Sequence, residues 1–282
     1  MGKLVCAFAV SHAPGVTGWP EKAEAGERER FLKGYGEMSR RLYESKPDVI
    51  IGIANDHVLN FFLDNIPDFC VGVSPEHSGP AEFFKDWLAV PDYSVAGHPE
   101  LAAALIQEGA RDGIKFGFCE RLLMDDNFSV PLTLLTPRMD VPFVPIHMNC
   151  IVPPLPTNEY CYRVGQTIRR IIEEKRPAGE RVALMATGGL SHDPGGKRYF
   201  DVDEEFDRWF LSLMEKGDPD EVIHEVTLER MLAAGDGGTG ELLAWIAAMG
   251  AVGPRKAEVL TYEPIKAWRC GMGVIDWALA PD

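Results

Sequence analysis

The sequence predicts an α/β fold: a single domain, residues 1–282, with a central, mostly parallel or mixed sheet covered by helices on both faces. Three observations predict it. Apolar runs of strand length recur along the chain, segments with helical spacing lie between them, and the apolar runs are continuous. Continuous runs are typical of strands buried on both faces. Alternation of strands and helices is typical of α/β proteins.

The predicted strands are short apolar segments, at 3–11, 48–55, 143–148, 181–187 and 270–277. The predicted helices lie between them, at 21–46, 99–112, 158–175, 203–216 and 239–249. In the segment 158–175, apolar residues recur at intervals of three and four, and Asn158 is expected to cap the helix N-terminus. No internal repeat or linker divides the chain, which favours one domain.

Composition excludes several classes of protein. The chain has 28 Lys and Arg against 43 Asp and Glu, a formal net charge of -15, and such a surface repels nucleic-acid phosphates. No stretch approaches the length of a transmembrane helix. The apolar N-terminal run leads directly into a candidate functional residue, which argues against a signal peptide. The six cysteines form no CxxC pair and lie in apolar segments, so we expect reduced thiols and a cytoplasmic location.

Three of the seven histidines directly follow predicted strands. They are His12, His57 and His192, and in open α/β sheets chemistry gathers where strands end. The other four do not follow strand ends: His147 lies within a strand, and His77, His98 and His224 lie in loop or helix contexts.

Two imidazoles and one carboxylate form a common Fe(II) site that leaves coordination positions open for substrate and dioxygen. His12 and His57 are candidates for the imidazoles, and Glu241, which follows a glycine-rich loop, is a candidate for the carboxylate. The alternatives are that both are ordinary loop histidines and that Glu241 is favoured only by the dipole of the helix it opens.

Several short motifs along the chain carry a family resemblance. They are "SHAPG" at 11–15, "LKGYGEM" at 32–38, "PDVIIGIANDH" at 47–57, "VPIHMN" at 144–149, "ATGGLSH" at 186–192, "EEFD" at 204–207 and "GTGELLAW" at 238–245. In order and spacing, the sequence resembles the class III extradiol ring-cleavage dioxygenases, the family of the protocatechuate 4,5-dioxygenase beta subunit.

The resemblance implies a role for each matched residue. His12, His57 and Glu241 fall where the family places its iron ligands, and His192 falls where it places the base. The cofactor implied is Fe(II), although such a ligand set also accepts Mn(II), and O2 is the co-substrate. The glycines before His192 are expected to let the chain turn tightly, and an imidazole suits proton removal near neutral pH.

One position departs from the family pattern. In "LLMDDNFSVPL", alignment through Val130 and Pro131 places Asp126 where the family has a histidine that assists proton transfer. A carboxylate can accept a proton, or donate one if burial raises its pKa, but it cannot supply an imidazolium charge. The alternative is that Asp126 is an ordinary loop acid.

Other residues are candidates for supporting roles. Asn55 and Asp56 flank His57 and are candidates for orienting it, although Asp56 equally suits a turn. Arg269 and Lys266, in the C-terminal stretch 261–273, are candidates for binding a substrate carboxylate, and Trp268 for packing against the ring. The alternative is that these three lie at the surface.

The sequence therefore predicts a non-haem Fe(II)-dependent extradiol dioxygenase. Its expected substrate is a carboxylated catechol of the protocatechuate, gallate or aminophenol type, opened to a semialdehyde. The alternatives are a metal-dependent hydrolase or lyase on the same scaffold, with Asp126 activating water, and a non-catalytic relative. A homodimer or a separate small subunit is expected to close the pocket.

Overall fold

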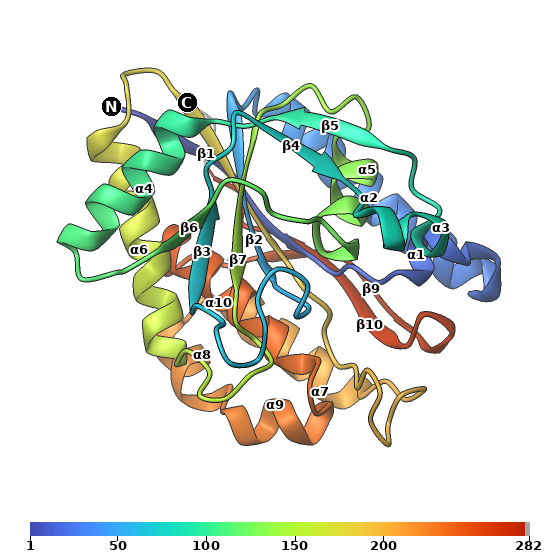
Figure 1. Cartoon of the computed structure of the whole chain (residues 1–282). Coiled ribbons are helices and arrows are strands. Elements are labelled where there is room, and N and C mark those ends of the chain that lie inside the picture. The colour runs from blue at the N-terminus through green and yellow to red at the C-terminus, as the bar shows by residue number, and fades with distance from the viewer. Residues whose placement is uncertain (280–282) are drawn as a thin grey trace.

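An eight-stranded mixed sheet runs through the centre of the computed structural model, which describes residues 1–279 (Figure 1). Its strand order is β6-β3-β7-β2-β8-β1-β10-β9. The strands are β1 Lys3–Val10, β2 Val49–Asn55, β3 Phe69–Gly72, β6 Gly117–Cys119, β7 Phe143–Met148, β8 Arg181–Thr187, β9 Glu258–Ile265 and β10 Cys270–Asp276. A two-stranded sheet pairs β4 Glu76–Gly79 with β5 Tyr93–Ala96.

The four central strands of the large sheet are parallel. β7, β2, β8 and β1 pair in that order. β3 and β10 then join them in the antiparallel sense on either side. All of the strands predicted from the sequence are present, and the mixed sheet is confirmed. Because β2, β8 and β1 are parallel neighbours, the loops after their carboxyl ends leave the sheet at one edge.

The helices connect these strands. They are α1 Gly15–Gly18, α2 Ala25–Glu44, α3 Lys85–Leu88, α4 Pro99–Arg111, α5 Asp126–Leu135, α6 Asn158–Lys175, α7 Glu204–Lys216, α8 Pro219–Glu225, α9 Leu228–Ala234 and α10 Leu242–Val252. Short 3-10 turns occupy Pro20–Lys22, Glu82–Phe84, Thr239–Glu241 and Lys266–Trp268.

Every predicted helix is found: α6 has the predicted bounds, and the others differ at one or both ends. The segment predicted as a helix at 239–249 begins as a 3-10 turn and continues as α10. The predicted cap of α6 is wrong: Thr157 accepts the cap hydrogen bond from Tyr160 N at 3.2 Å. Asn158 is instead the first helical residue, and its side-chain amide donates to the carbonyl oxygens of Ile223 and Val226.

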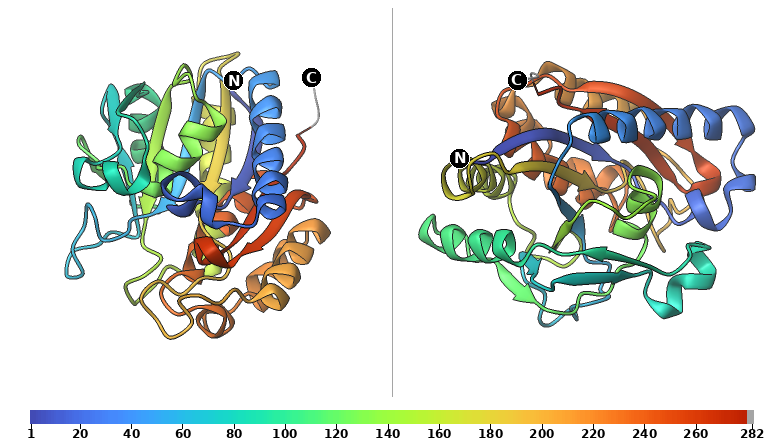
Figure 2. Two further views of the ribbon diagram at one scale, coloured as in Figure 1. Left: turned by 90° about the vertical axis from the view of Figure 1, so that its right-hand side faces the viewer. Right: turned by 90° about the horizontal axis from the view of Figure 1, so that it is seen from above.

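Both faces of the sheet are covered. α4, α6 and α10 pack on one face, and α2 and α5 on the other (Figure 1). In Figure 2, α2 runs along β9 and β10. Alternate residues of β1 enter the two cores, with Ala7 and Ala9 in one and Phe8 and Val10 in the other. This two-sided burial explains why the strand sequences are continuous apolar runs.

The closest helix contact is between α6 and α10. Every residue of α10 is buried, as expected for a helix that is apolar on all sides. A Cβ added at Gly165 of α6 would lie 1.9 Å from the carbonyl oxygen of Ala247. Since the obstacle is backbone, only glycine permits this approach.

All six cysteines lie in the described part of the chain, and all are free thiols. Among residues 1–279, no helix is both long enough and apolar enough to cross a membrane.

The Gly165→Ala substitution should destabilise the fold by about 1–3 kcal/mol, because overpacking against rigid backbone forces the helices apart. Gly36→Ala is the matched control: Gly36 also lies in a helix, but nothing stands within 4 Å of its would-be Cβ. That control should be neutral or stabilising by up to about 1 kcal/mol. Urea unfolding of both variants measures the difference, and equal stabilities would contradict the packing argument.

Candidate metal and substrate site

Three histidines meet where neighbouring strands end. His12 follows β1, His57 follows β2 and His192 follows β8, and the sheet places β8 between the other two. The ring centroids of His12 and His57 are 5.4 Å apart, with the rings nearly perpendicular. The parallel register thus gathers side chains that are distant in the sequence.

A buried carboxylate, Glu241, lies between the three rings. Its Oε1 is 2.8 Å from His57 Nε2. Its Oε2 is 3.8 Å from His12 Nε2 and 3.7 Å from His192 Nε2. Glu241 is 1% exposed and ends the 3-10 turn that leads into α10. The structure therefore brings the predicted ligands and the predicted base to one point.

Neutral groups of the chain also hold Glu241. The backbone N–H of Gly189 donates to Oε2 at 2.6 Å, and the side-chain amide of Asn55 donates to Oε1 at 3.3 Å. The Oδ1 atom of Asn55 accepts from Cys150 N at 3.2 Å, which fixes the amide. Asn55 thus orients the carboxylate rather than the ring of His57.

The glycines before His192 have a different role from the one expected. Neither Gly188 nor Gly189 has a positive φ. A Cβ at Gly188 would lie 2.7 Å from Glu241 Cβ, and one at Gly189 would lie 2.7 Å from the His192 ring. These positions are glycine because the carboxylate and the imidazole come so close to the backbone.

The far nitrogen of each metal-site ring is also held. Nδ1 of His12 lies 2.9 Å from Thr187 Oγ1. Nδ1 of His57 lies 3.0 Å from Asp125 Oδ2. Hydrogen bonds of this kind fix ring orientation and leave Nε2 to face a metal. The sequence analysis did not single out Asp125, although an acid before a helix is a common capping signal and Asp125 caps α5.

The pKa values of His12 and Glu241 are both lowered, which favours binding of a cation by these two side chains. Burial lowers the pKa of His12 to about 4, so its ring is neutral at pH 7. Burial alone would raise the pKa of Glu241, but interactions with His12 and His192 and the hydrogen bond from His57 hold that pKa well below its usual range. An ionised carboxylate beside a neutral imidazole is the form that binds metal.

His57 faces a carboxylate at each ring nitrogen. Burial opposes its charge, yet Asp125 and Glu241 together raise the pKa of His57 well above its usual value. Since both carboxylates only accept, the ring donates from both nitrogens and is an imidazolium. The proton on Nε2 of His57 lies between the ring and the Glu241 carboxylate, where a metal ion would bind both groups. The residues His12, His57 and Glu241 therefore fit a divalent metal ion.

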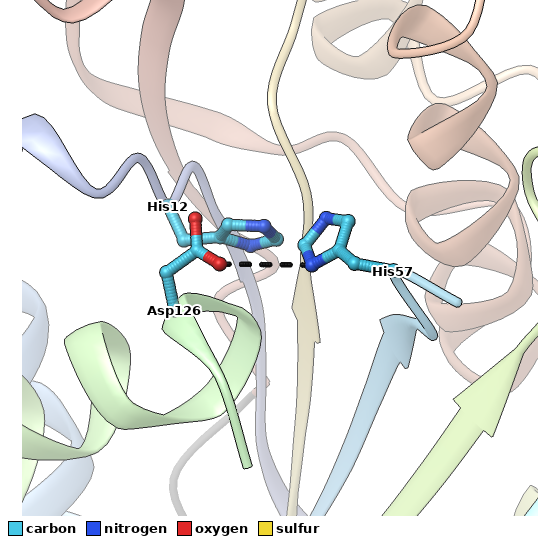
Figure 3. Close-up of side chains that lie close together, drawn as sticks. All are labelled: His12, His57 and Asp126. Carbon is cyan, nitrogen blue, oxygen red and sulfur yellow. Dashed lines mark ion pairs between the residues drawn. The ribbon is translucent and has the colours of Figure 1, made fainter. Parts of the chain in front are cut away.

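Asp126 lies on the opposite side of His57 from Glu241. Its Oδ1 is 3.6 Å from His57 Nδ1, and Figure 3 shows its carboxylate pointing toward that ring. Donor atoms of His12, His57 and Asp126 lie within 4.8 Å of one another, which makes them a second possible ligand group. Because Asp125 already holds His57 Nδ1 at 3.0 Å, the set with Glu241, which faces Nε2 of His57 at 2.8 Å, fits better. Burial raises the pKa of Asp126 to about 7.

Asp56 holds the loop that follows β2. It accepts hydrogen bonds from the backbone of Asn60 and Phe61, and it pairs with His147 at 3.3 Å. None of these bonds joins Asp56 to the ring of His57; Asp125 supplies that contact. The turn role is therefore the one its contacts support.

A cavity of about 210 Å³ opens onto the histidines. Its lining combines the polar groups of His12, His57, Asp125, Asp126 and His192 with the aromatic rings of Trp19, Phe84, Trp87, Tyr199 and Trp268. This lining suits a flat aromatic ligand with one polar, metal-facing edge.

Of the three C-terminal candidates, two line this cavity and one does not. Trp268 is buried and forms part of the wall, and Arg269 is the cation of the lining. The guanidinium of Arg269 stacks 4.3 Å from the ring centroid of Tyr199 and hydrogen-bonds its hydroxyl. Lys266 is exposed and lies outside the lining, because the tight turn between β9 and β10 directs only its last residues inward.

A family model described as the catalytic LigB subunit of aromatic ring-opening dioxygenase matches residues 6–273, so the chain belongs to this family. The match confirms the resemblance and the prediction of an extradiol ring-cleavage dioxygenase. Members of the family depend on a metal ion, and the site described above offers the donors for one.

Curated relatives agree with this family. A 2,3-dihydroxyphenylpropionate/2,3-dihydroxicinnamic acid 1,2-dioxygenase of Photorhabdus laumondii is 28% identical over 97% of this chain and 96% of its own. An enzyme of the same name from Klebsiella pneumoniae is 26% identical over 94% and 95%. A solved structure of an uncharacterized Escherichia coli K12 protein matches with a TM-score of 0.58 at 13% identity, covering 96% and 99% of the two chains, and shows the same fold.

Loading the metal-free protein with Mn(II) at pH 7 should release about one proton per ion, since the metal displaces the proton of His57. The raised pKa of His57 sets the sign: metal affinity falls as pH drops below that pKa. Calorimetry in buffers of different ionisation enthalpy measures the release.

The Glu241→Gln substitution should weaken Mn(II) binding, and Asp126→Asn should leave the Mn(II) affinity nearly unchanged. The reverse order would assign the site to Asp126.

Proposed function

We propose that this chain is a non-haem Fe(II)-dependent extradiol dioxygenase that opens the ring of a catechol with an acidic side chain. One observation carries the proposal: His12, His57 and Glu241 converge at the floor of an aromatic cavity, with His192 beside them. Iron held by these three residues would supply coordination positions for the diol and O2 and a path for charge between them. Mn(II) suits the same donors.

His192 is the proposed base. Its Nδ1 lies 3.0 Å from the carbonyl oxygen of Leu190, and because a carbonyl only accepts, Nδ1 carries the hydrogen. In the neutral ring, Nε2 is then the basic nitrogen, and Nε2 is the atom that faces Glu241. The ring can therefore take a proton from a hydroxyl of a diol bound over the metal site.

The cavity suits an arylalkyl acid. The named relatives act on 2,3-dihydroxyphenylpropionate, a catechol with a propionate chain, and we extend that substrate class to this chain. Arg269 lines the cavity with its guanidinium stacked on Trp19 and Tyr199, and this planar group can bind a carboxylate in bidentate fashion. Trp268 supplies a buried apolar wall for the ring.

Asp126 gives this site an acid where the family resemblance implies a histidine. Its raised pKa lets it exchange a proton near neutral pH, so we propose that it assists proton transfer to the product. The alternative of an oxygen-independent hydrolase or lyase, with Asp126 activating water, is tested by the same assay as the main proposal. A homodimer or separate small subunit and a cytoplasmic location remain predictions.

Anaerobically prepared Fe(II) protein should consume one O2 per 2,3-dihydroxyphenylpropionate and form a yellow ring-opened product. His192→Ala should keep its metal and lose activity by about 10²–10⁴-fold, the usual contribution of a general base. His224→Ala is the control, since His224 is exposed and bonds only its own helix. Turnover without O2 uptake would favour the hydrolase or lyase.

Arg269→Met should raise the KM for the carboxylated diol by about 10–100-fold, through loss of a charge-assisted hydrogen bond. It should change the KM for unsubstituted catechol much less. Lys266→Met, three residues away and exposed, should change neither value. Equal effects of Arg269→Met on both substrates would show that the guanidinium does not meet the carboxylate.

A further inference from the structure

His192 lies in an irregular segment between β8 and α7, and its ring packs closely against Gly189 and Gly238. Beyond the hydrogen bond to Leu190 O, its backbone N–H contacts Thr239 Oγ1 at 3.4 Å. The ring is bonded to its own segment, so the direction of its Nε2 depends on how the backbone of 190–192 is held.

Asp207, a fully buried carboxylate on α7, holds that backbone. Ser191 N donates to Oδ1 at 2.7 Å, and Ser191 Oγ donates to Oδ2 at 3.0 Å. The hydroxyl of Tyr262 on β9 donates to the same Oδ2 at 2.8 Å. A carboxylate is unfavourable in a core unless donors surround it, and these donors are concentrated on the residue directly before the base.

The opposite side of the segment is paired with β10. Leu190 N donates to Gly271 O at 3.2 Å, and Gly271 N donates to Ser191 O at 3.0 Å. A Cβ at Gly271 would lie 1.9 Å from Asp207 Oδ2, so the strand backbone packs directly on the carboxylate. Asp203 N donates to Ser191 Oγ at 2.8 Å, which leaves the serine hydroxyl hydrogen for Asp207.

We propose that Asp207 is a positioning residue for ring opening: acting through Ser191, it fixes the segment so that His192 Nε2 faces the metal site. The inference rests on the proposed role of His192 as base. A residue that only stabilised the fold would need no bonds to both the backbone and the side chain of Ser191. Asp207 is not among the residues that line the cavity, so its proposed effect on the reaction passes through this segment.

A double-mutant cycle tests the inference on the Fe(II) enzyme with 2,3-dihydroxyphenylpropionate. Asp207→Asn should lower kcat by about 10–100-fold while KM changes by less than about 3-fold, as expected for a misplaced catalytic group. In the His192→Ala background, the same substitution should cost less than about 2-fold, because the two residues act as one unit. Equal losses in both backgrounds would overturn the proposal.

Two further variants grade the effect. Tyr262→Phe removes one of the three hydrogen bonds and should give a smaller loss of kcat, and it keeps the test open if Asp207→Asn fails to fold. Glu263→Gln is the matched control: Glu263 is also a buried carboxylate and follows Tyr262 on β9, but it pairs with Arg30 on α2. It should leave kcat unchanged; a loss equal to that of Tyr262→Phe would overturn the proposal.

A readout independent of turnover separates this inference from the proposed function. In ¹⁵N-histidine NMR of the metal-free protein, with His192 assigned by difference against His192→Ala, the neutral ring should be the Nδ1–H tautomer. Asp207→Asn should give a mixture of tautomers. An unchanged tautomer would overturn the positioning role. If no diol supports O2 uptake by the wild type, the proposed function fails, whatever the spectra show.

Discussion

The burial of the Glu241 carboxylate is the constraint on which the site depends. A charge taken out of water is stable only if donors or cations surround it. Here the surroundings are three imidazoles, an amide and a backbone N–H. The parallel pairing of β2, β8 and β1 supplies the imidazoles, since it brings their carboxyl ends to one edge. The same enclosure gives a metal ion an ionised carboxylate and shields the reaction from bulk water.

The three rings differ in what holds their Nδ1 atom, and this difference separates their roles. A hydroxyl faces His12, a carboxylate faces His57 and a carbonyl faces His192. In the proposed metal site, His12 would therefore be a neutral donor, and His57 an electron-rich ligand once its proton leaves. His192 keeps a fixed tautomer with a free Nε2. Three histidines in similar positions thus differ in protonation and tautomer because their Nδ1 atoms have different hydrogen-bond partners.

The cavity beside the three histidines is lined by both polar and aromatic side chains. Polar groups gather at the sheet edge, because both faces of the sheet are filled by apolar helices. Aromatic residues of distant segments complete the lining of the cavity, and Arg269 stacks on one of them, Tyr199. A substrate with a diol at one end and an acid at the other matches this polarity. The loop of His192 joins the two regions, and α7 and β10 hold it in place.

By itself, the sequence determined the buried strands, the main helices, the histidines at strand ends and the family. These features depend on local periodicity and short motifs, which can be read without knowing any contact between distant residues. Tertiary structure decided what depends on contacts between distant residues. Asn55 meets Glu241 across 186 positions, and Asp125 rather than Asp56 reaches His57. It also decided that Lys266 stays outside the cavity and that Asp207 bonds Ser191, the residue before His192. Neither spacing nor composition records which side chain meets a buried charge, since the folded sheet edge alone sets those distances.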